Sequence, residues 1–141
     1  TELLELAQEE LTHFQMVHQR ILARGFELGK PRKDEYVRQL MAYFPQGGKR
    51  EDRLVNDLLV SAMIEARSCE RFKVLSENIE NKELATFYRD LMVSEANHYT
   101  LFLNYARKYG GKEEANRKWD ALLDFEASIM KNLGNQELIH G

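Results

Sequence analysis

Apolar side chains recur every three or four residues through most of this chain, which is the spacing of one face of an α-helix. Glycine and proline interrupt the pattern at only a few places. The pattern predicts helices over residues 2–24, from 35 to about 43, from about 51 to 109 with a break near 78–82, and from about 112 to 133, and leaves a short polar tail at 134–141 with no predicted role. Thr1 and Asp34 are the expected N-caps of the first two helices, and Gly25 is the expected stop of the first. The sequence therefore predicts an all-α protein.

Three of these helices carry carboxylate or imidazole side chains within their apolar stripes. The stripes consist of Leu3, Leu6, Glu10, His13, Val17 and Ile21; of Leu54, Leu58, Ser61, Glu65, Ser68, Phe72, Leu75 and Ile79; and of Leu84, Tyr88, Leu91, Glu95, His98, Phe102, Tyr105 and Tyr109. A buried carboxylate without a compensating cation is strongly unfavourable, and these stripes contain no Lys or Arg. The last predicted helix is expected to turn no ligand-type residue inward.

Glu10 with His13, and Glu95 with His98, form two copies of the motif E-x-x-H, whose two side chains leave the same face of a helix. Two such helices, plus one Glu from each of two others, form the ligand set of di-iron carboxylate bundles. Glu65 precedes Glu95 by 30 residues, which places both at one level of an antiparallel helix pair. The pattern thus predicts that these five residues bind metal. By the same spacing a fourth carboxylate is expected upstream of the first residue. Either the chain lacks its first helix, which is the preferred interpretation, or the site is incomplete.

Composition narrows the class of protein further. A length of 141 residues predicts a single domain over 1–141, and one cysteine excludes an internal disulfide and a cysteine-rich metal site. Any metal must therefore be held by His and carboxylates. No apolar run is long enough to span a membrane, and the first residues do not resemble a signal peptide, so we expect a cytoplasmic protein without a membrane partner.

Three segments add a resemblance to a known family. The two E-x-x-H helices with the intervening Glu resemble the ferritin-like di-iron superfamily over residues 1 to about 109. Within it, residues 6–14, 64–72 and 94–99 are similar to the MiaE family of bacterial tRNA hydroxylases; they read LAQEELTHF, IEARSCERF and SEANHY. The resemblance implies a ferritin-like four-helix bundle with an extra short helix and a C-terminal helix, the N-terminal helix being absent from this chain.

The resemblance also implies an activity. In this family a non-haem di-iron centre with two iron ions uses O2 to hydroxylate the isopentenyl group of a methylthio-isopentenyl adenosine beside the tRNA anticodon. By this similarity Glu10 and Glu95 bridge the irons, Glu65 and His98 bind one, and His13 binds the other together with the missing Glu. An external electron donor is required, for which a ferredoxin-type system is the candidate. From its place beside Glu10, Glu9 is a candidate hydrogen-bond partner of the His98 imidazole.

A tRNA substrate requires basic charge, and the charge of this chain is uneven. The net charge is -3, but residues 20–53 contain nine basic and five acidic side chains, so this segment carries +4 and the rest carries -7. The candidate phosphate contacts are Lys30, Arg32, Lys33, Lys49 and Arg50, and the candidate stacking residues between them are Tyr36, Tyr43 and Phe44. An ordinary solvated loop is the alternative interpretation of the same segment.

Two other functions fit the pattern. An iron-storage or peroxide-scavenging ferritin-like protein would use the same ligands, and a metal-free helical bundle would serve as an interaction module. Cys69 is expected to be a small packed residue, and Glu70 is expected to pair with a neighbouring Arg such as Arg67 or Arg71.

Overall fold

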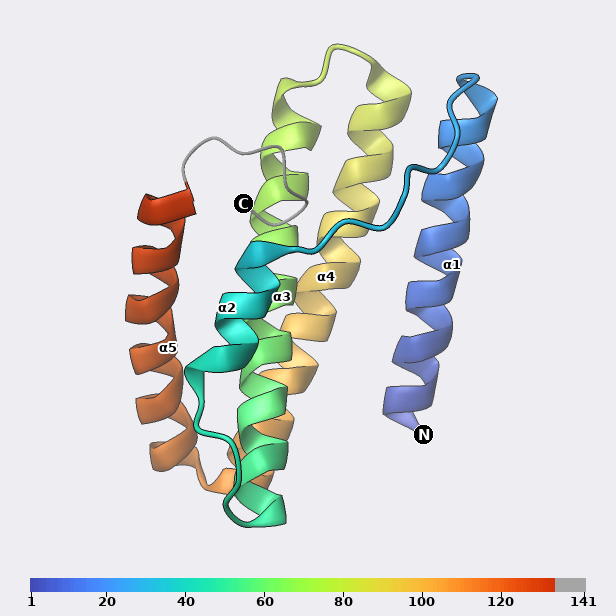
Figure 1. The fold of residues 1–141 in the computed structure, drawn as a ribbon. Helices are drawn as coiled ribbons and strands as arrows, with labels where there is room; N and C mark the ends of the chain where they lie inside the picture. The colour runs from blue at the N-terminus through green and yellow to red at the C-terminus, as the bar shows by residue number, and fades with distance from the viewer. Residues whose placement is uncertain (134–141) are drawn as a thin grey trace. The chain divides into compact units, whose positions relative to one another are not determined.

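The computed structural model describes residues 1–133, and the predicted tail at 134–141 lies outside the described residues. Over residues 1–133 the chain forms helices and no strands. The helices are α1 (Glu2–Ala23), α2 (Glu35–Tyr43), α3 (Arg50–Asn78), α4 (Lys82–Gly110) and α5 (Lys112–Leu133) (Figure 1). Their bounds agree with the predicted ones to within one residue, so the all-α prediction is confirmed.

The helix ends follow from local hydrogen bonding. The carboxylate of Asp34 accepts a hydrogen bond from the backbone N–H of Val37 at 3.1 Å, and the Asn81 side chain caps α4 in the same way through Leu84 at 3.0 Å. Thr1 occupies the N-cap position of α1, but its side chain forms no capping hydrogen bond. Gly25 follows α1 with a φ of 76°, a left-handed conformation that explains why the helix stops there.

The described chain divides into two units, residues 1–33 with α1 and residues 34–133 with α2 to α5. The prediction of one domain over residues 1–141 stays a prediction. In the second unit α3 and α4 run side by side as a long antiparallel pair, and α2 and α5 pack against it (Figure 1). No helix within residues 1–133 combines the length and the apolar character that a membrane span requires.

The core of the second unit is larger on α3 than one stripe predicts. Leu54, which was predicted to lie in the seam, is 41% exposed, whereas its neighbour Val55 is only 2% exposed. The reason is that α3 contacts α2, α4 and α5, so that more than one of its faces is covered. The buried apolar residues that form one cluster are Tyr36, Leu40, Val55, Leu58, Leu59, Val60, Ala62, Met63, Leu103, Ala106, Ala115, Trp119, Leu122 and Ile129.

Near the N-terminus of α3 and the C-terminus of α4, the backbones of these two helices approach closely. A Cβ atom placed on Gly110 would lie 2.9 Å from Cγ2 and 3.0 Å from Cγ1 of Val55. Real Cβ atoms rarely come so near to other atoms, so glycine at this position permits the close packing of the two helices.

Candidate metal centre

The middle of the α3–α4 pair contains three side chains of the predicted ligand set. Glu65 comes from α3, and Glu95 and His98 come from successive turns of α4. Glu95 is 7% exposed and His98 is 4% exposed, although both residue types are normally at the surface or paired. The otherwise apolar stripes of α3 and α4 therefore carry polar side chains at the same level of the helix pair.

These three residues converge. Glu65, Glu95 and His98 each offer a ligand atom, and the three atoms lie within 4.8 Å of one another. The Nδ1 atom of His98 lies 3.9 Å from a carboxylate oxygen of Glu65. The 30-residue spacing between Glu65 and Glu95 thus does bring them to the same level, as an antiparallel helix pair requires.

Two carboxylates and one imidazole at this separation have the chemistry of a metal site. Carboxylate oxygens and imidazole nitrogens bind divalent first-row metals such as iron, and a cation between the buried carboxylate of Glu95 and the partly buried carboxylate of Glu65 offsets the free energy of their desolvation. Arg67 is near Glu65 in sequence, but its guanidinium group bonds to Glu70 and Glu126 instead. The residues present therefore fit a bound cation.

The first E-x-x-H motif lies on α1. Nδ1 of His13 is 3.5 Å from a carboxylate oxygen of Glu10, and Nε2 of His13 is 3.9 Å from Glu9 on the preceding turn. Both side chains of the motif thus leave the same side of the helix, as the i, i+3 spacing requires. Because α1 belongs to the unit formed by residues 1–33, the convergence of this motif with Glu65 and α4, and the approach of Glu9 to His98, stay predictions.

A buried carboxylate on α5 corrects one sequence-based expectation. Glu126 is 4% exposed, although the last helix was predicted to turn no ligand-type residue inward. It accepts a hydrogen bond from the hydroxyl of Tyr36 on α2 at 3.1 Å and one from Nε of Arg67 on α3 at 2.8 Å. Burial, and then the negative charge of Glu126, raise the pKa of the Tyr36 hydroxyl. Glu126 continues the inward stripe of Trp119, Leu122 and Ile129, which is the signal that could have identified it.

The same cluster changes the interpretation of the predicted stacking residues. Tyr36 is completely buried, so the prediction that it stacks on a nucleotide is wrong. The ring of Tyr43 stacks on Phe125 of α5 at 4.5 Å, and Phe44 packs edge-on against Tyr43 at 4.9 Å. These aromatic rings therefore anchor α2 to the bundle.

The candidate phosphate contacts are at exposed positions. Lys30, Arg32 and Lys33 follow α1 in the first unit, whereas Lys49 is the N-cap residue of α3 and Arg50 is its first residue. No observation tests their contact with tRNA, which stays a prediction.

The two expectations for the segment after Glu65 are confirmed. Glu70 forms an ion pair with Arg67 at 2.7 Å. Cys69 is partly buried and its thiol donates to the carbonyl of Met92 at 3.5 Å, while burial raises the pKa of the thiol. Cys69 is thus a packed residue, as the sequence predicts.

Comparison with known proteins agrees with the helical fold and with the polar motifs. A solved structure described as "Protein 43 with aldehyde deformylating oxygenase activity from Synechococcus" is 32% identical, with a TM-score of 0.80 over 86% of this chain and 60% of that one. It is a ferritin-like helical protein, in agreement with the predicted fold class.

Two curated relatives carry the same name, tRNA 2-(methylsulfanyl)-N(6)-isopentenyladenosine(37) hydroxylase. The protein from Pseudomonas putida is 38% identical over 94% of this chain, and the protein from Salmonella typhimurium is 33% identical over 79% of it. The matched regions cover 63% and 40% of these relatives, so the chain spans less than two thirds of their length. The family model described as tRNA-(MS[2]IO[6]A)-hydroxylase (MiaE) matches residues 1–141. Since this match extends over the whole sequence, the chain belongs to the MiaE family.

Proposed function

We propose that this chain forms the metal-binding core of a non-haem di-iron monooxygenase that modifies tRNA. The substrate is the isopentenyl group of a 2-methylthio-N6-isopentenyl adenosine next to the anticodon, the modified nucleoside in the names of both curated relatives. The observation that carries the proposal is the convergence of Glu65, Glu95 and His98 on the buried face of the α3–α4 pair. Membership of the MiaE family connects that cluster with hydroxylation rather than with iron storage or peroxide scavenging.

The proposed ligand set combines both E-x-x-H motifs with the carboxylate of α3. Glu65, Glu95 and His98 supply one group of donors, and Glu10 and His13 supply the other. When bound, the two iron ions supply the redox chemistry by which O2 places one oxygen atom in a C–H bond while the other leaves as water. The balance needs two electrons and two protons, which an external donor such as a ferredoxin-type system delivers.

The protein residues have separate tasks at this site. Helices α3 and α4 hold Glu65, Glu95 and His98 on rigid backbone, so that little ordering is needed when metal binds. The low exposure of Glu95 and His98 limits access of water to the donor atoms. Glu9 is proposed to hydrogen-bond the imidazole of His98 and so to orient it toward metal.

The tRNA is proposed to be held by exposed cations. Lys49 and Arg50 stand at the N-terminus of α3, where the helix dipole also favours a phosphate, and Lys30, Arg32 and Lys33 add positive charge in the segment after α1. Such contacts position the nucleic acid without reading its sequence. From a tRNA substrate we infer that the protein is cytoplasmic.

The direct test uses the intact protein that contains this chain. Nucleosides from tRNA are compared by mass spectrometry in cells with the gene, without it, and with the gene carrying either Glu65→Ala or the exposed control Glu77→Ala. We expect the hydroxylated adenosine to disappear in the deletion and in the Glu65 variant, and to be present in the control. An unchanged hydroxylated pool in the deletion strain would refute the proposed substrate, and peroxide-dependent iron oxidation by that protein would then favour the storage or scavenging alternative.

A further inference from the structure

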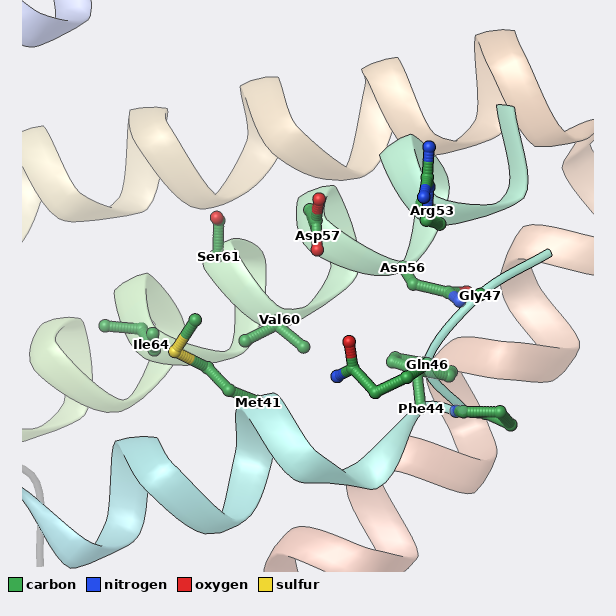
Figure 2. Close-up of a pocket in the computed structure, with 11 residues that line it drawn as sticks. Met41, Phe44, Gln46, Gly47, Arg53, Asn56, Asp57, Val60, Ser61 and Ile64 are labelled. Carbon is green, nitrogen blue, oxygen red and sulfur yellow. The ribbon is translucent and has the colours of Figure 1, made fainter. Parts of the chain in front are cut away.

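A cavity of about 430 Å³ opens between α2, the segment after it and the first half of α3 (Figure 2). Its volume lies in the range of small-molecule sites in proteins. Every residue that lines it belongs to the second unit: Met41, Phe44, Pro45, Gln46, Gly47, Arg53, Asn56, Asp57, Val60, Ser61 and Ile64. In Figure 2 the side chains of Val60 and Gln46 point into this space, and the side chain of Met41 extends across it toward Ile64.

The α3 wall of this cavity leads toward the candidate metal centre. Its residues, from Arg53 to Ile64, follow one another at intervals of three and one, so they form a continuous stripe that is about 16 Å long at 1.5 Å per residue. Ser61, near the far end of this stripe, lies one helical turn before Glu65. One end of the cavity is therefore near the N-terminus of α3, and the other end is at the level of α3 just before Glu65.

The chemistry of the lining changes along this length. Met41, Phe44, Val60 and Ile64 give it apolar walls, and Gln46, Asn56 and Asp57 add amide and carboxylate groups. At the outer end Arg53 contributes a cation, one turn after Lys49 and close to Arg50. The cavity thus combines a cation at its outer end, amide and carboxylate groups, and apolar surface that extends to Ile64, the residue before Glu65.

Lys118 of α5 fixes one of the polar groups and joins this cavity to a second one. Its ammonium group donates to Oδ1 of Asn56 at 2.9 Å, so the amide presents its NH2 group as a donor, and it lies 5.9 Å from the centre of the Phe44 ring. The second cavity, of about 320 Å³, lies against the same Phe44 and Pro45 and is lined by Arg117 and Lys118. Lys118 therefore adds a positive charge beside the Phe44–Pro45 segment, and Arg117 adds a second guanidinium group that is paired with Glu114.

We propose that the larger cavity binds the target nucleotide, an adenine whose N6 atom carries an apolar chain, with the chain directed along α3 toward Glu65. This inference rests on the proposed function and names the site that holds its substrate. An enzyme that reacts with a tRNA base must accept that base outside its stack. Gln46 and Asn56 are side chains of the type that pairs with the edge of an adenine, and Asp57 can accept a hydrogen bond from a ribose hydroxyl.

The charges set the orientation of the nucleotide. Asp57 would repel a phosphate in the middle of the cavity, whereas Arg53 attracts one at the outer end. The apolar substituents are then left for the Met41, Val60 and Ile64 surface, where their transfer from water is favourable. The phosphates on either side continue toward Lys49 and Arg50, or toward Arg117 and Lys118 beside the second cavity.

The test measures discrimination between two RNAs by the intact protein. One is a short anticodon stem-loop that carries 2-methylthio-N6-isopentenyl adenosine, and the other is the same RNA with plain adenosine. Binding is followed by fluorescence anisotropy without a reductant, so that no turnover occurs. We expect the wild-type protein to prefer the modified RNA by about tenfold or more, since a buried isopentenyl group contributes several methyl and methylene groups.

The main variant fills the cavity from an exposed position. Met41 is 63% exposed, so Met41→Trp is compatible with folding, while Val93→Trp on α4 is the matched control at a position 53% exposed. We expect Met41→Trp to reduce the preference for modified RNA to within about twofold, and Val93→Trp to retain it. Arg53→Ala should weaken both RNAs to a similar extent and reduce the dependence of affinity on salt.

The outcomes separate this inference from the proposed function. Equal binding of the two RNAs by the wild-type protein, or an unchanged preference in Met41→Trp, would overturn the nucleotide site even if cellular tRNA is hydroxylated. The expected loss of preference, in a protein whose gene has no effect on hydroxylated tRNA, would support the nucleotide site and refute the hydroxylase function.

Discussion

The hydroxyl of Tyr36 donates a hydrogen bond to the carboxylate of Glu126 over 3.1 Å, although ninety residues separate them in the chain. Arg67 of α3 bonds to the same carboxylate, so one buried acid connects α2, α3 and α5. Arg67 is two residues from Glu65, and this cluster therefore fixes α3 close to the candidate ligands. We expect it to stabilise the arrangement of these three helices.

Removal of Glu126 should destabilise the protein. Glu126→Ala leaves the partly buried Arg67 without its main counter-charge, and we expect the free energy of unfolding to fall by about 3 kcal/mol. Tyr36→Phe removes one hydrogen bond and should lower it by about 1 kcal/mol. Urea denaturation measures both effects. Glu114→Ala, which breaks an exposed ion pair with Arg117, is the control and should change stability very little. Equal stability of the Glu126 and Glu114 variants would contradict a stabilising role for the cluster.

Glu35 should titrate at unusually low pH. Hydrogen bonds from Arg38, at 2.7 Å from Nε, and then from Gln39 lower the pKa of Glu35 from 4.5 to about 2. Because the pKa is lowered by folding, the stabilisation is complete above about pH 4.5 and is lost as the pH falls through about 2. Titration of the Glu35 carboxyl carbon by NMR measures this value. Arg38→Ala should return the pKa toward 4.5, and a Glu35 pKa that is the same in both proteins would exclude Arg38 as the cause.

Gly110→Ala should destabilise the α3–α4 pair in spite of the higher helix propensity of alanine. The new methyl group would overlap with Val55, and overpacking of this kind destabilises by about 1–3 kcal/mol. Thermal or urea unfolding of the single variants and of Gly110→Ala with Val55→Ala gives the coupling energy. We expect the two substitutions to compensate each other by about 1 kcal/mol or more. Additive effects would mean that Val55 does not oppose the new methyl group, which would contradict the prediction.

Replacement of a proposed ligand should weaken metal binding while the fold persists. Glu65→Ala and His98→Ala each remove a donor from the cluster on α3 and α4, and we expect the affinity for Fe(II) to fall by more than about tenfold. Anaerobic titration with Fe(II), followed by elemental analysis, gives the affinity and the iron content per chain. Circular dichroism should show retained helix, because each substitution also removes a buried polar group. Iron content equal to that of Glu77→Ala in both variants would refute the ligand assignment.

Two features could be predicted from the sequence because both depend on local spacing: the helices themselves, and the position of the polar side chains at one level of the α3–α4 pair. The caps at Asp34 and Asn81 act within three residues, and the E-x-x-H spacing fixes the side of the helix from which Glu95 and His98 project. The 30-residue interval from Glu65 to Glu95 needed only the rise per residue of an antiparallel helix pair.

What the sequence alone did not determine is which further faces of each helix are covered. Glu126 and Tyr36 became a buried pair because α2 and α5 pack against faces of α3 that a single apolar stripe leaves to solvent. Val55 replaced Leu54 in the core where α3 lies against Gly110 of α4. The cavity beside Met41 and Val60 likewise exists only where α2 and α3 meet. Helix formation and side-chain direction follow from neighbours a few residues away, whereas burial depends on contacts between segments far apart in the chain, and these are decided by the tertiary structure.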